Sequence, residues 1–323
     1  MEWLKLKALL IERGSVRVTG EPVAKRYIGY ATAGPGTGGQ GSIFLKIGQR
    51  RVRLSLSTTS PLTIGHEGDG QVTLSIDEKV IKGELEDVAL HCPRQAYVTL
   101  SERCIYSCRY CAVPLQKGRI KTVDELEDRV ISVKNRIDGI AITSGVAESV
   151  ESEERRTIAL VRRLRPLDLP IGVSIYPTTK TAGKLYELGV SEVKFNTETA
   201  TSALFGVMCP GLDWNSMQAA LDQSVELFGK NHVFSNVIVG LGETDEDLER
   251  CITDLSNRGV IPVLRPLNPI ASLADWQRPS AARLLELYRY EELALKRAGL
   301  STRMATTMCI ACTGCDLVPG KDT

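Results

Sequence analysis

The sequence predicts an α/β protein in which a partial TIM-type barrel of six or seven β/α units follows a small β-rich N-terminal domain. From residue 96 onward, short β-branched runs alternate with longer amphipathic segments, as parallel strands joined by right-handed crossovers do. Before residue 90, short segments that alternate apolar and polar residues lie between turn signals. We therefore expect three parts: a β-rich domain over 1–90, the barrel over 91–308, and a C-terminal segment over 309–323.

The N-terminal part is expected to be a small antiparallel β-domain. Its expected strands cover 15–19, 42–47, 51–56 and 71–76. The glycine-rich stretch 34–41 is followed by neither a lysine nor a helix, so we interpret it as a turn rather than as a phosphate-binding loop.

The barrel part is expected to place its chemistry at the carboxyl ends of its strands, as TIM-type barrels do. Its expected strands cover 96–100, 139–143, 171–175, 192–196, 233–239, 260–264 and 302–306. Helices are expected near 122–136, 150–164, 179–188, 214–229, 244–258 and 280–298.

Composition narrows the classes of partner and the compartment. The 323 residues carry 40 basic and 39 acidic side chains, a balance that argues against a nucleic-acid or anionic-membrane partner. The N-terminal residues lack the apolar region of a secretory signal, and no run approaches the roughly 18 apolar residues of a membrane span. We therefore expect a cytoplasmic protein, in which the nine cysteines stay reduced and can bind metal.

Three cysteines follow the first expected barrel strand. Cys104, Cys108 and Cys111 are separated by four and three residues, so one loop can bring all three together. Thiolates are the ligands of iron–sulfur clusters, and a four-iron cluster held by three of them leaves one iron open to a cofactor. A zinc site is the alternative, although zinc fingers usually pair two cysteines with two distant ligands.

The Cys-x3-Cys-x2-Cys pattern, with Tyr110 before its last cysteine, resembles the radical S-adenosylmethionine (SAM) superfamily. The resemblance implies a [4Fe-4S] cluster whose open iron chelates SAM. It also implies reductive cleavage of SAM to a 5′-deoxyadenosyl radical, and an electron donor such as a ferredoxin.

Residues at later strand ends extend this resemblance to SAM binding. Asn196-Thr197-Glu198 is similar to a segment that biotin and lipoyl synthases place near the SAM ribose, and 237–243 is similar to the superfamily's stretch beneath the adenine. The implied cofactor-binding residues are Ser144, Gly145, Asn196, Glu198, Ile238, Gly240, Glu243 and Arg265.

A second group, Cys309, Cys312 and Cys315, lies near the C-terminus. If 302–306 is a seventh parallel strand, these thiols emerge on the same face of the barrel as the first group. We expect a second [4Fe-4S] cluster there, with a zinc knuckle as the alternative. Cys92 is the candidate fourth ligand and Arg303 a second possibility, whereas Cys209 and Cys251 are expected in the core, or Cys209 in the substrate pocket.

Within the superfamily, the barrel most resembles the biotin synthase-like group, and the stretch 195–269 with the final cysteines resembles archaeal-type two-component lipoyl synthases. That resemblance implies sulfur insertion at an unactivated C–H of an octanoyl chain on a carrier protein, together with a paralogous radical SAM subunit. One alternative is a biotin-synthase-like enzyme acting on a small molecule. The other is a non-catalytic iron–sulfur carrier subunit.

Overall fold

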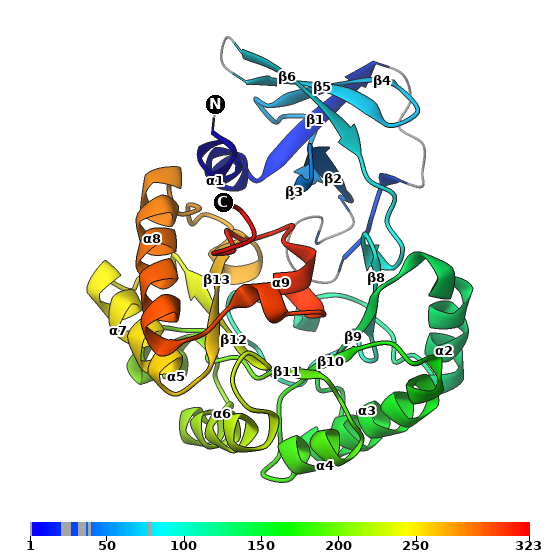
Figure 1. The fold of residues 1–323 in the computed structure, drawn as a ribbon, viewed down its shortest axis with the longest axis vertical. Helices are drawn as coiled ribbons and strands as arrows, with labels where there is room; N and C mark the ends of the chain where they lie inside the picture. The colour runs from blue at the N-terminus through cyan, green and yellow to red at the C-terminus, as the bar shows by residue number, and fades with distance from the viewer. Residues whose placement is uncertain (1, 21–26, 32–36, 38–39, 77–78) are drawn as a thin grey trace.

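The computed structural model describes residues 2–20, 27–31, 37, 40–76 and 79–323. It contains two sheets, a closed six-stranded barrel followed by an open seven-stranded sheet. The first sheet ends at Leu85 and the second begins at His91. In Figure 1, helices surround the outside of the curved second sheet, and the N-terminal barrel lies across the side that these helices leave uncovered.

The N-terminal barrel is antiparallel except at its first strand. Strand β1 pairs in parallel with both β3 and β4, so the expectation of a wholly antiparallel domain is wrong at this strand. Most of the glycine-rich stretch, residues 34–36 and 38–39, lies outside the described residues. The strands are β1 (Ser15–Gly20), β2 (Ser42–Ile47), β3 (Arg50–Leu56), β4 (Thr63–Gly68), β5 (Gln71–Ile76) and β6 (Lys79–Leu85).

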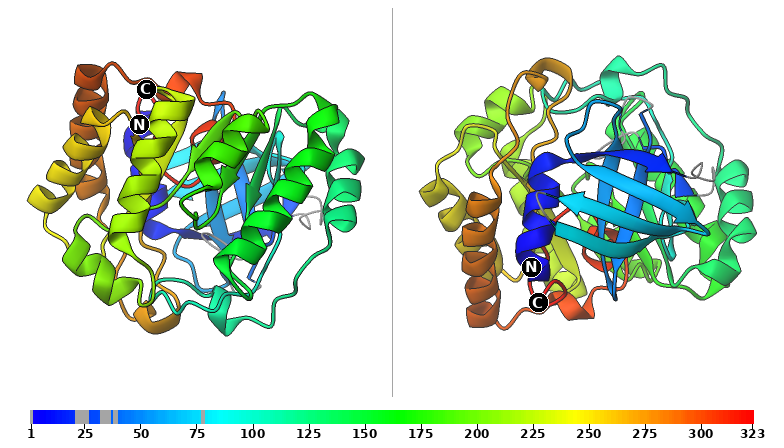
Figure 2. Two further views of the ribbon diagram at one scale, coloured as in Figure 1. Left: turned by 90° about the horizontal axis from the view of Figure 1, so that it is seen from below. Right: turned by 90° about the horizontal axis from the view of Figure 1, so that it is seen from above.

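A helix that was not expected precedes this barrel. Helix α1 (Trp3–Arg13) places Trp3, Leu6, Leu10 and Ile11 in the core and ends at Gly14, which adopts the left-handed conformation of a helix C-cap. It lies beside α8 (Ala281–Ala298), as Figure 2 shows from above. The two chain ends therefore come together near the junction of the two sheets.

The second sheet is a half-barrel of six parallel strands with an antiparallel β7 at one edge. Adjacent parallel strands pair in sequence order from β8 to β13, as repeated right-handed crossovers require. The strands are β7 (His91–Cys92), β8 (Gln95–Thr99), β9 (Gly139–Thr143), β10 (Ile171–Ser174), β11 (Glu192–Lys194), β12 (Val233–Val239) and β13 (Ile261–Pro266).

The helices between these strands begin where the sequence supplies N-cap side chains. The side chains of Thr122, Ser149 and Asp213 each accept a hydrogen bond from a backbone N–H in the first helical turn, and Thr244 forms a capping box with Asp247. None of the helices that the structure describes is long and apolar enough to cross a membrane. The remaining crossover helices are α2 (Val123–Ser132), α3 (Val150–Leu164), α4 (Thr181–Glu187), α5 (Ser202–Met208), α6 (Trp214–Phe228) and α7 (Asp245–Asn257).

The expected seventh strand over 302–306 is wrong. Residues Thr302–Met304 form a 3-10 turn, and Met308–Cys312 form the short helix α9. The backbone N–H groups of Thr306 and Thr307 donate to the buried carboxylate of Glu192, at 2.8 and 2.9 Å, and are therefore not available to a neighbouring strand. Residues 301–323, here called the C-terminal arm, consequently run across the amino-terminal ends of the parallel strands.

We predict that Glu192→Gln weakens attachment of the C-terminal arm. The amide keeps one acceptor oxygen but loses the charge that strengthens the hydrogen bonds from Thr306 and Thr307. The free energy of unfolding should fall by about 2 kcal/mol, the usual scale for hydrogen bonds to a charged group, in a urea titration followed by circular dichroism. Glu226→Gln, an exposed change on α6, should leave it within about 0.5 kcal/mol, and an equal loss in both variants would contradict the prediction.

Candidate active site

A single chamber of about 370 Å³ occupies the inside of the half-barrel, and both cysteine groups line it. Cys104, Cys108 and Cys111 lie at the end formed by the carboxyl termini of the strands. Cys309, Cys312 and Cys315, with Cys92, lie at the opposite end. The expectation that both groups emerge on one face is wrong, because the C-terminal arm is not a strand, yet both groups face the same interior.

The first cysteine group lies on a loop that backbone hydrogen bonds hold in place. The N–H of Ile105 donates to Val146 at 2.7 Å, that of Arg109 donates to Met208 at 2.9 Å, and that of Cys111 turns back to Cys108 at 3.0 Å. All three thiols are partly exposed. The loop therefore presents three thiols to one volume, the donor set that a cluster with one open iron requires.

The surroundings of two thiols on this loop, those of Cys108 and Cys111, favour their protonated forms. A hydrogen bond with Cys209, together with burial, raises the pKa of Cys108, and burial raises the pKa of Cys111 to about 12. Thiolates bind metal, so cluster binding would release these protons. Among the described residues, no three His, Cys, Asp or Glu side chains are placed to hold a single metal ion. A cubane differs because each of its thiolates binds a separate iron.

Ser144 and Gly145 support the cluster loop directly. The Ser144 hydroxyl accepts the N–H of Ser101 at 3.0 Å and donates to Glu153 at 2.8 Å, so it links β8 to α3. A Cβ at Gly145 would lie 2.3 Å from the carbonyl oxygen of Arg103, so a glycine is required for the loop to pass this close. Both residues also line the chamber, as SAM binding would require.

Asn196, Glu198 and Asn236 form a polar group beside the first cysteines. Asn196 donates to Glu198 at 3.0 Å and accepts the N–H of Asn236 at 3.2 Å. Glu198 has a φ of 59°, and burial raises the pKa of its carboxyl group. All three residues line the chamber, which puts a carboxylate and two amides within reach of a bound cofactor.

The loop after β12 places its expected residues in different roles. Ile238 lines the chamber, whereas Gly240 and Glu243 do not. The buried Glu243 carboxylate accepts the N–H groups of Gly240 and Leu241, both at 2.7 Å, and pairs with Arg283 at 3.1 Å. Glu243 therefore stabilises the loop from the side that faces away from the chamber. A contact between Glu243 and SAM stays a prediction.

The second cysteine group includes Cys92. A hydrogen bond between the Cys92 and Cys312 thiols lowers the pKa of Cys312 to about 7 and raises that of Cys92. Cys309 and Cys315 line the same end of the chamber, whereas Arg303 is exposed and donates to the carbonyl of Gly320 at 3.0 Å. This geometry favours Cys92 over Arg303 as the fourth ligand of a cluster.

Arg265 lies toward this second group rather than beside the first. It forms an ion pair with the buried Asp316. Burial lowers the pKa of its guanidinium, but Asp316 and the thiols of Cys309 and Cys315 more than offset this, so its pKa is well above the usual value. Its expected contact with SAM is therefore less well supported by this geometry than a role near the C-terminal cysteines.

The chamber residues that were not identified in the sequence include Arg53, Tyr97 and Lys194. Lys194 ends β11 and donates to the sulfur of Cys309 at 3.4 Å, and Arg53 comes from the N-terminal barrel. Burial lowers the pKa of Lys194, but Cys309 and Tyr97 raise it by more, so the ammonium is the stable form. The available signal was a lysine between the apolar residues Val193 and Phe195 of an expected buried strand.

The two remaining cysteines lie outside the chamber walls, although Cys209 hydrogen-bonds to Cys108 of the first group. Cys251 is buried in α7, and Cys209 lies against Tyr110, with 3.5 Å between its sulfur and the phenol oxygen. Neither cysteine lines the chamber.

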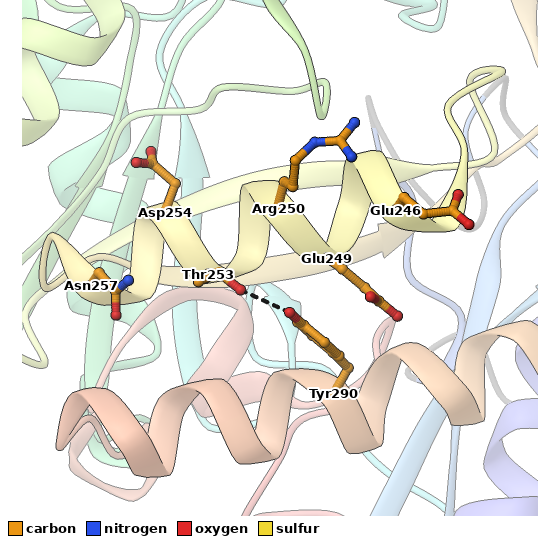
Figure 3. A pocket seen from close by; sticks show the side chains of 7 residues that line it. All are labelled: Glu246, Glu249, Arg250, Thr253, Asp254, Asn257 and Tyr290. Carbon is orange, nitrogen blue, oxygen red and sulfur yellow. Dashed lines mark hydrogen bonds between the residues drawn. The ribbon is translucent and has the colours of Figure 1, made fainter.

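A second hollow lies on the outer surface between α7 and α8 (Figure 3). Its walls are polar, and the Thr253 and Tyr290 hydroxyls meet across it at 2.9 Å. It contains no thiol and is open to solvent, so the candidate active site is the chamber.

Comparisons with known proteins agree with this geometry. Residues 98–255 match the model of the Radical SAM superfamily. A lipoyl synthase of Picrophilus torridus is 26% identical to this chain over 217 residues, which cover 60% of this chain and 70% of that protein. A lipoyl synthase of Leptospira biflexa is 27% identical over 215 residues, which cover 56% of this chain and 66% of that protein. The crystal structure of the FeFe-hydrogenase maturase HydG from Carboxydothermus hydrogenoformans superposes with a TM-score of 0.52 at 17% identity, over 63% of this chain and 51% of that one, and so shares the fold.

We predict that Gly145→Ala displaces the loop of Cys104, Cys108 and Cys111. The new methyl group would overlap the Arg103 carbonyl, a backbone atom that cannot move without moving the loop. Anaerobically reconstituted protein should lose about four irons per chain, the content of one cubane, in a colorimetric iron assay. Gly183→Ala is the matched control, because a Cβ there meets nothing within 4 Å. Equal iron contents in the two variants would argue against this role of Gly145.

Proposed function

The chain is a radical SAM enzyme, and we propose that it inserts sulfur at an unactivated C–H bond of a protein-bound octanoyl chain, as a lipoyl synthase subunit. The observation that carries the proposal is one chamber with three cysteines at one end and four at the other. A substrate between them would face both a radical source and a sulfur source.

Two clusters would divide the chemistry. When bound at Cys104, Cys108 and Cys111, a reduced cluster supplies the electron that cleaves SAM, and a second cluster at Cys92, Cys309, Cys312 and Cys315 would supply sulfide. Overall, one C–H bond, one SAM and one sulfide become a C–S⁻ group, methionine and 5′-deoxyadenosine. The electron consumed in cleaving SAM equals the electron released when the C–S bond forms, so each insertion is redox-balanced.

The chain's own residues would position the reactants and exclude water. Gly145 and Ser144 hold the loop that presents the first cysteines. Asn196 and Glu198 offer an amide and a carboxylate to the ribose hydroxyls of SAM, as their resemblance to lipoyl synthases implies. Tyr97 and Lys194, between the two cysteine groups, line the part of the chamber that the reacting carbon would occupy.

The proposed partners follow from the proposed substrate. An octanoylated carrier protein would present the acyl chain, an electron donor such as a ferredoxin would reduce the first cluster, and a paralogous radical SAM subunit would share the two sulfur insertions.

One observation favours the small-molecule alternative. Phe44 and Arg53 of the N-terminal barrel line the chamber, so this domain has a structural role that needs no carrier protein. A chamber of about 370 Å³ is also within the usual size range of small-ligand pockets.

We predict that replacing the two cysteine groups separately has different effects. Alanine at Cys104, Cys108 and Cys111 should abolish SAM cleavage, measured as 5′-deoxyadenosine by liquid chromatography. Alanine at Cys309, Cys312 and Cys315 should preserve SAM cleavage but remove about four of about eight irons and any sulfur transfer. Cys251→Ala is the control, because its thiol lies in α7 away from both groups. SAM cleavage by the first variant, or full iron in the second, would refute the assignments.

We predict that the reduced enzyme adds sulfur to an octanoyl-lysyl carrier peptide. Mass spectrometry should show one or two sulfur atoms replacing hydrogen on the acyl chain, with the chain alone or with a candidate paralogue added. Formation of 5′-deoxyadenosine without a sulfur-bearing peptide in either mixture would transfer support to the small-molecule alternative.

A further inference from the structure

The guanidinium of Arg53 lies in an unusual place for a side chain of the N-terminal barrel. Arg53 is on β3, yet it is 2% exposed and lines the chamber together with Cys92, Cys312 and Cys315. It lies over the ring of Phe44, with 5.3 Å from its central carbon to the ring centroid. The N-terminal domain therefore contributes a buried cation to the end of the chamber that holds the second cysteine group.

Two of its nitrogens are fixed by neighbours, and the third is not. Nε donates to Ser42 at 2.8 Å, and Nη1 lies 3.0 Å from Nε2 of His91. Nη1 can donate to Nε2 of His91 when that ring nitrogen carries no proton. Nη2 is buried and has no hydrogen-bond partner among the residues that the structure describes, an arrangement that is costly unless a bound group supplies an acceptor.

Lys194 contributes a second buried cation from the half-barrel. Its ammonium donates to Cys309 at 3.4 Å. Two other cations near the second group are already neutralised: Arg265 pairs with Asp316, and Arg51 pairs with Glu86. Within the described part of the chain, neither Arg53 nor Lys194 forms an ion pair with a carboxylate. Two buried positive charges, one from each sheet, thus face four cysteines.

This charge count fits a cluster with four thiolate ligands. An oxidised [4Fe-4S] core with four cysteine thiolates carries about two negative charges, and net charge and hydrogen bonds to sulfur set the reduction potential of such clusters. Two buried cations would balance those charges, and a buried charge is tolerated when it is paired.

A backbone contact between the N-terminal barrel and the C-terminal arm also fixes the position of Arg53 relative to the cysteines. The backbone N–H of Arg53 donates to the carbonyl of Gly314 at 2.6 Å, directly between Cys312 and Cys315. A Cβ at Gly314 would lie 2.6 Å from the Phe44 ring, so only glycine allows this contact. Strand β3 and the loop around Gly314 therefore hold the Arg53 cation close to the thiols of Cys312 and Cys315.

We propose that Arg53 and Lys194, one from each sheet, bind the second, anionic cluster, and that the N-terminal barrel forms part of that cluster's binding site. The inference rests on the proposed function, because it assumes a cluster at Cys92, Cys309, Cys312 and Cys315. Arg53 is a positioning residue, acting on the cluster's charge and stability rather than on the substrate.

The test measures the reduction potential of the second cluster in Arg53→Gln. Full-length protein is reconstituted anaerobically, with alanine at Cys104, Cys108 and Cys111 so that the second cluster alone is observed, and titrated by electron paramagnetic resonance. Loss of a cation should favour the oxidised form by about tenfold, a midpoint potential about 59 mV lower for one electron. Lys46→Gln is the matched control, since it removes a cation that pairs with Glu84 and lies outside the chamber. Arg53→Lys should restore much of the potential.

An unchanged potential and an unchanged rate of iron loss to a chelator in Arg53→Gln would overturn the proposal. Loss of the second cluster in Arg53→Gln, with recovery in Arg53→Lys, would support it. If Arg53→Gln does not fold, Lys194→Gln is measured in the same way and should show the same direction of change. Absence of the second cluster from the parent protein would instead refute the proposed function, so the two failures are distinguishable.

Discussion

The structure depends on how the buried C-terminal arm satisfies its backbone polar groups. A buried N–H or carbonyl without a partner is costly, and most of the arm beyond Thr306 is buried or half-buried. The half-barrel supplies the Glu192 carboxylate to two N–H groups and the Gln95 amide to the carbonyl of Met308. The N-terminal part supplies the Arg53 N–H to Gly314 and the buried Lys7 ammonium to the carbonyl of Thr313. The arm therefore has its observed path only when both sheets are present.

The two ends of the chamber differ in charge as well as in ligands. At the first end, the charge of Glu198 raises the pKa of Cys108 further, whereas a hydrogen bond with Tyr110 lowers it. At the second end, Arg51 and Arg53 lower the pKa of Cys312, and Lys194 lies against Cys309. The second end is thus prepared to hold a strongly anionic group without an additional cation, whereas the first end leaves room for a positively charged cofactor such as SAM.

Local patterns in the sequence were sufficient to predict the half-barrel but not the arm. Strand β9 coincides with the expected 139–143, because a β-branched run bounded by turn residues specifies a buried parallel strand from nearby residues alone. The arm follows a path set by Glu192, more than 110 residues earlier in the chain, and no local pattern encodes that contact. Arg53 was missed for a related reason. Arg51 and Arg53 alternate with apolar residues, which indicates a solvated strand face, and only the second sheet turns that face into an interior.

The two ends of the chamber differ in how far solvent reaches them. At the first end, Cys104, Cys108 and Cys111 are all partly exposed, with exposed Ile105 and Leu115 on the same loop region. At the second end, Cys309 and Cys315 are also partly exposed, but Cys92 and Cys312 are 1% and 8% exposed behind the N-terminal barrel. We therefore expect entry from the carboxyl ends of the strands, past Cys104, Cys108 and Cys111 and toward the second group. Under the proposed function, an acyl chain tethered outside would reach inward along this path while its carrier stayed on the surface. The same path ends at Arg53 and Lys194. A group that reaches this end of the chamber would therefore lie beside the second cysteine group and these two cations.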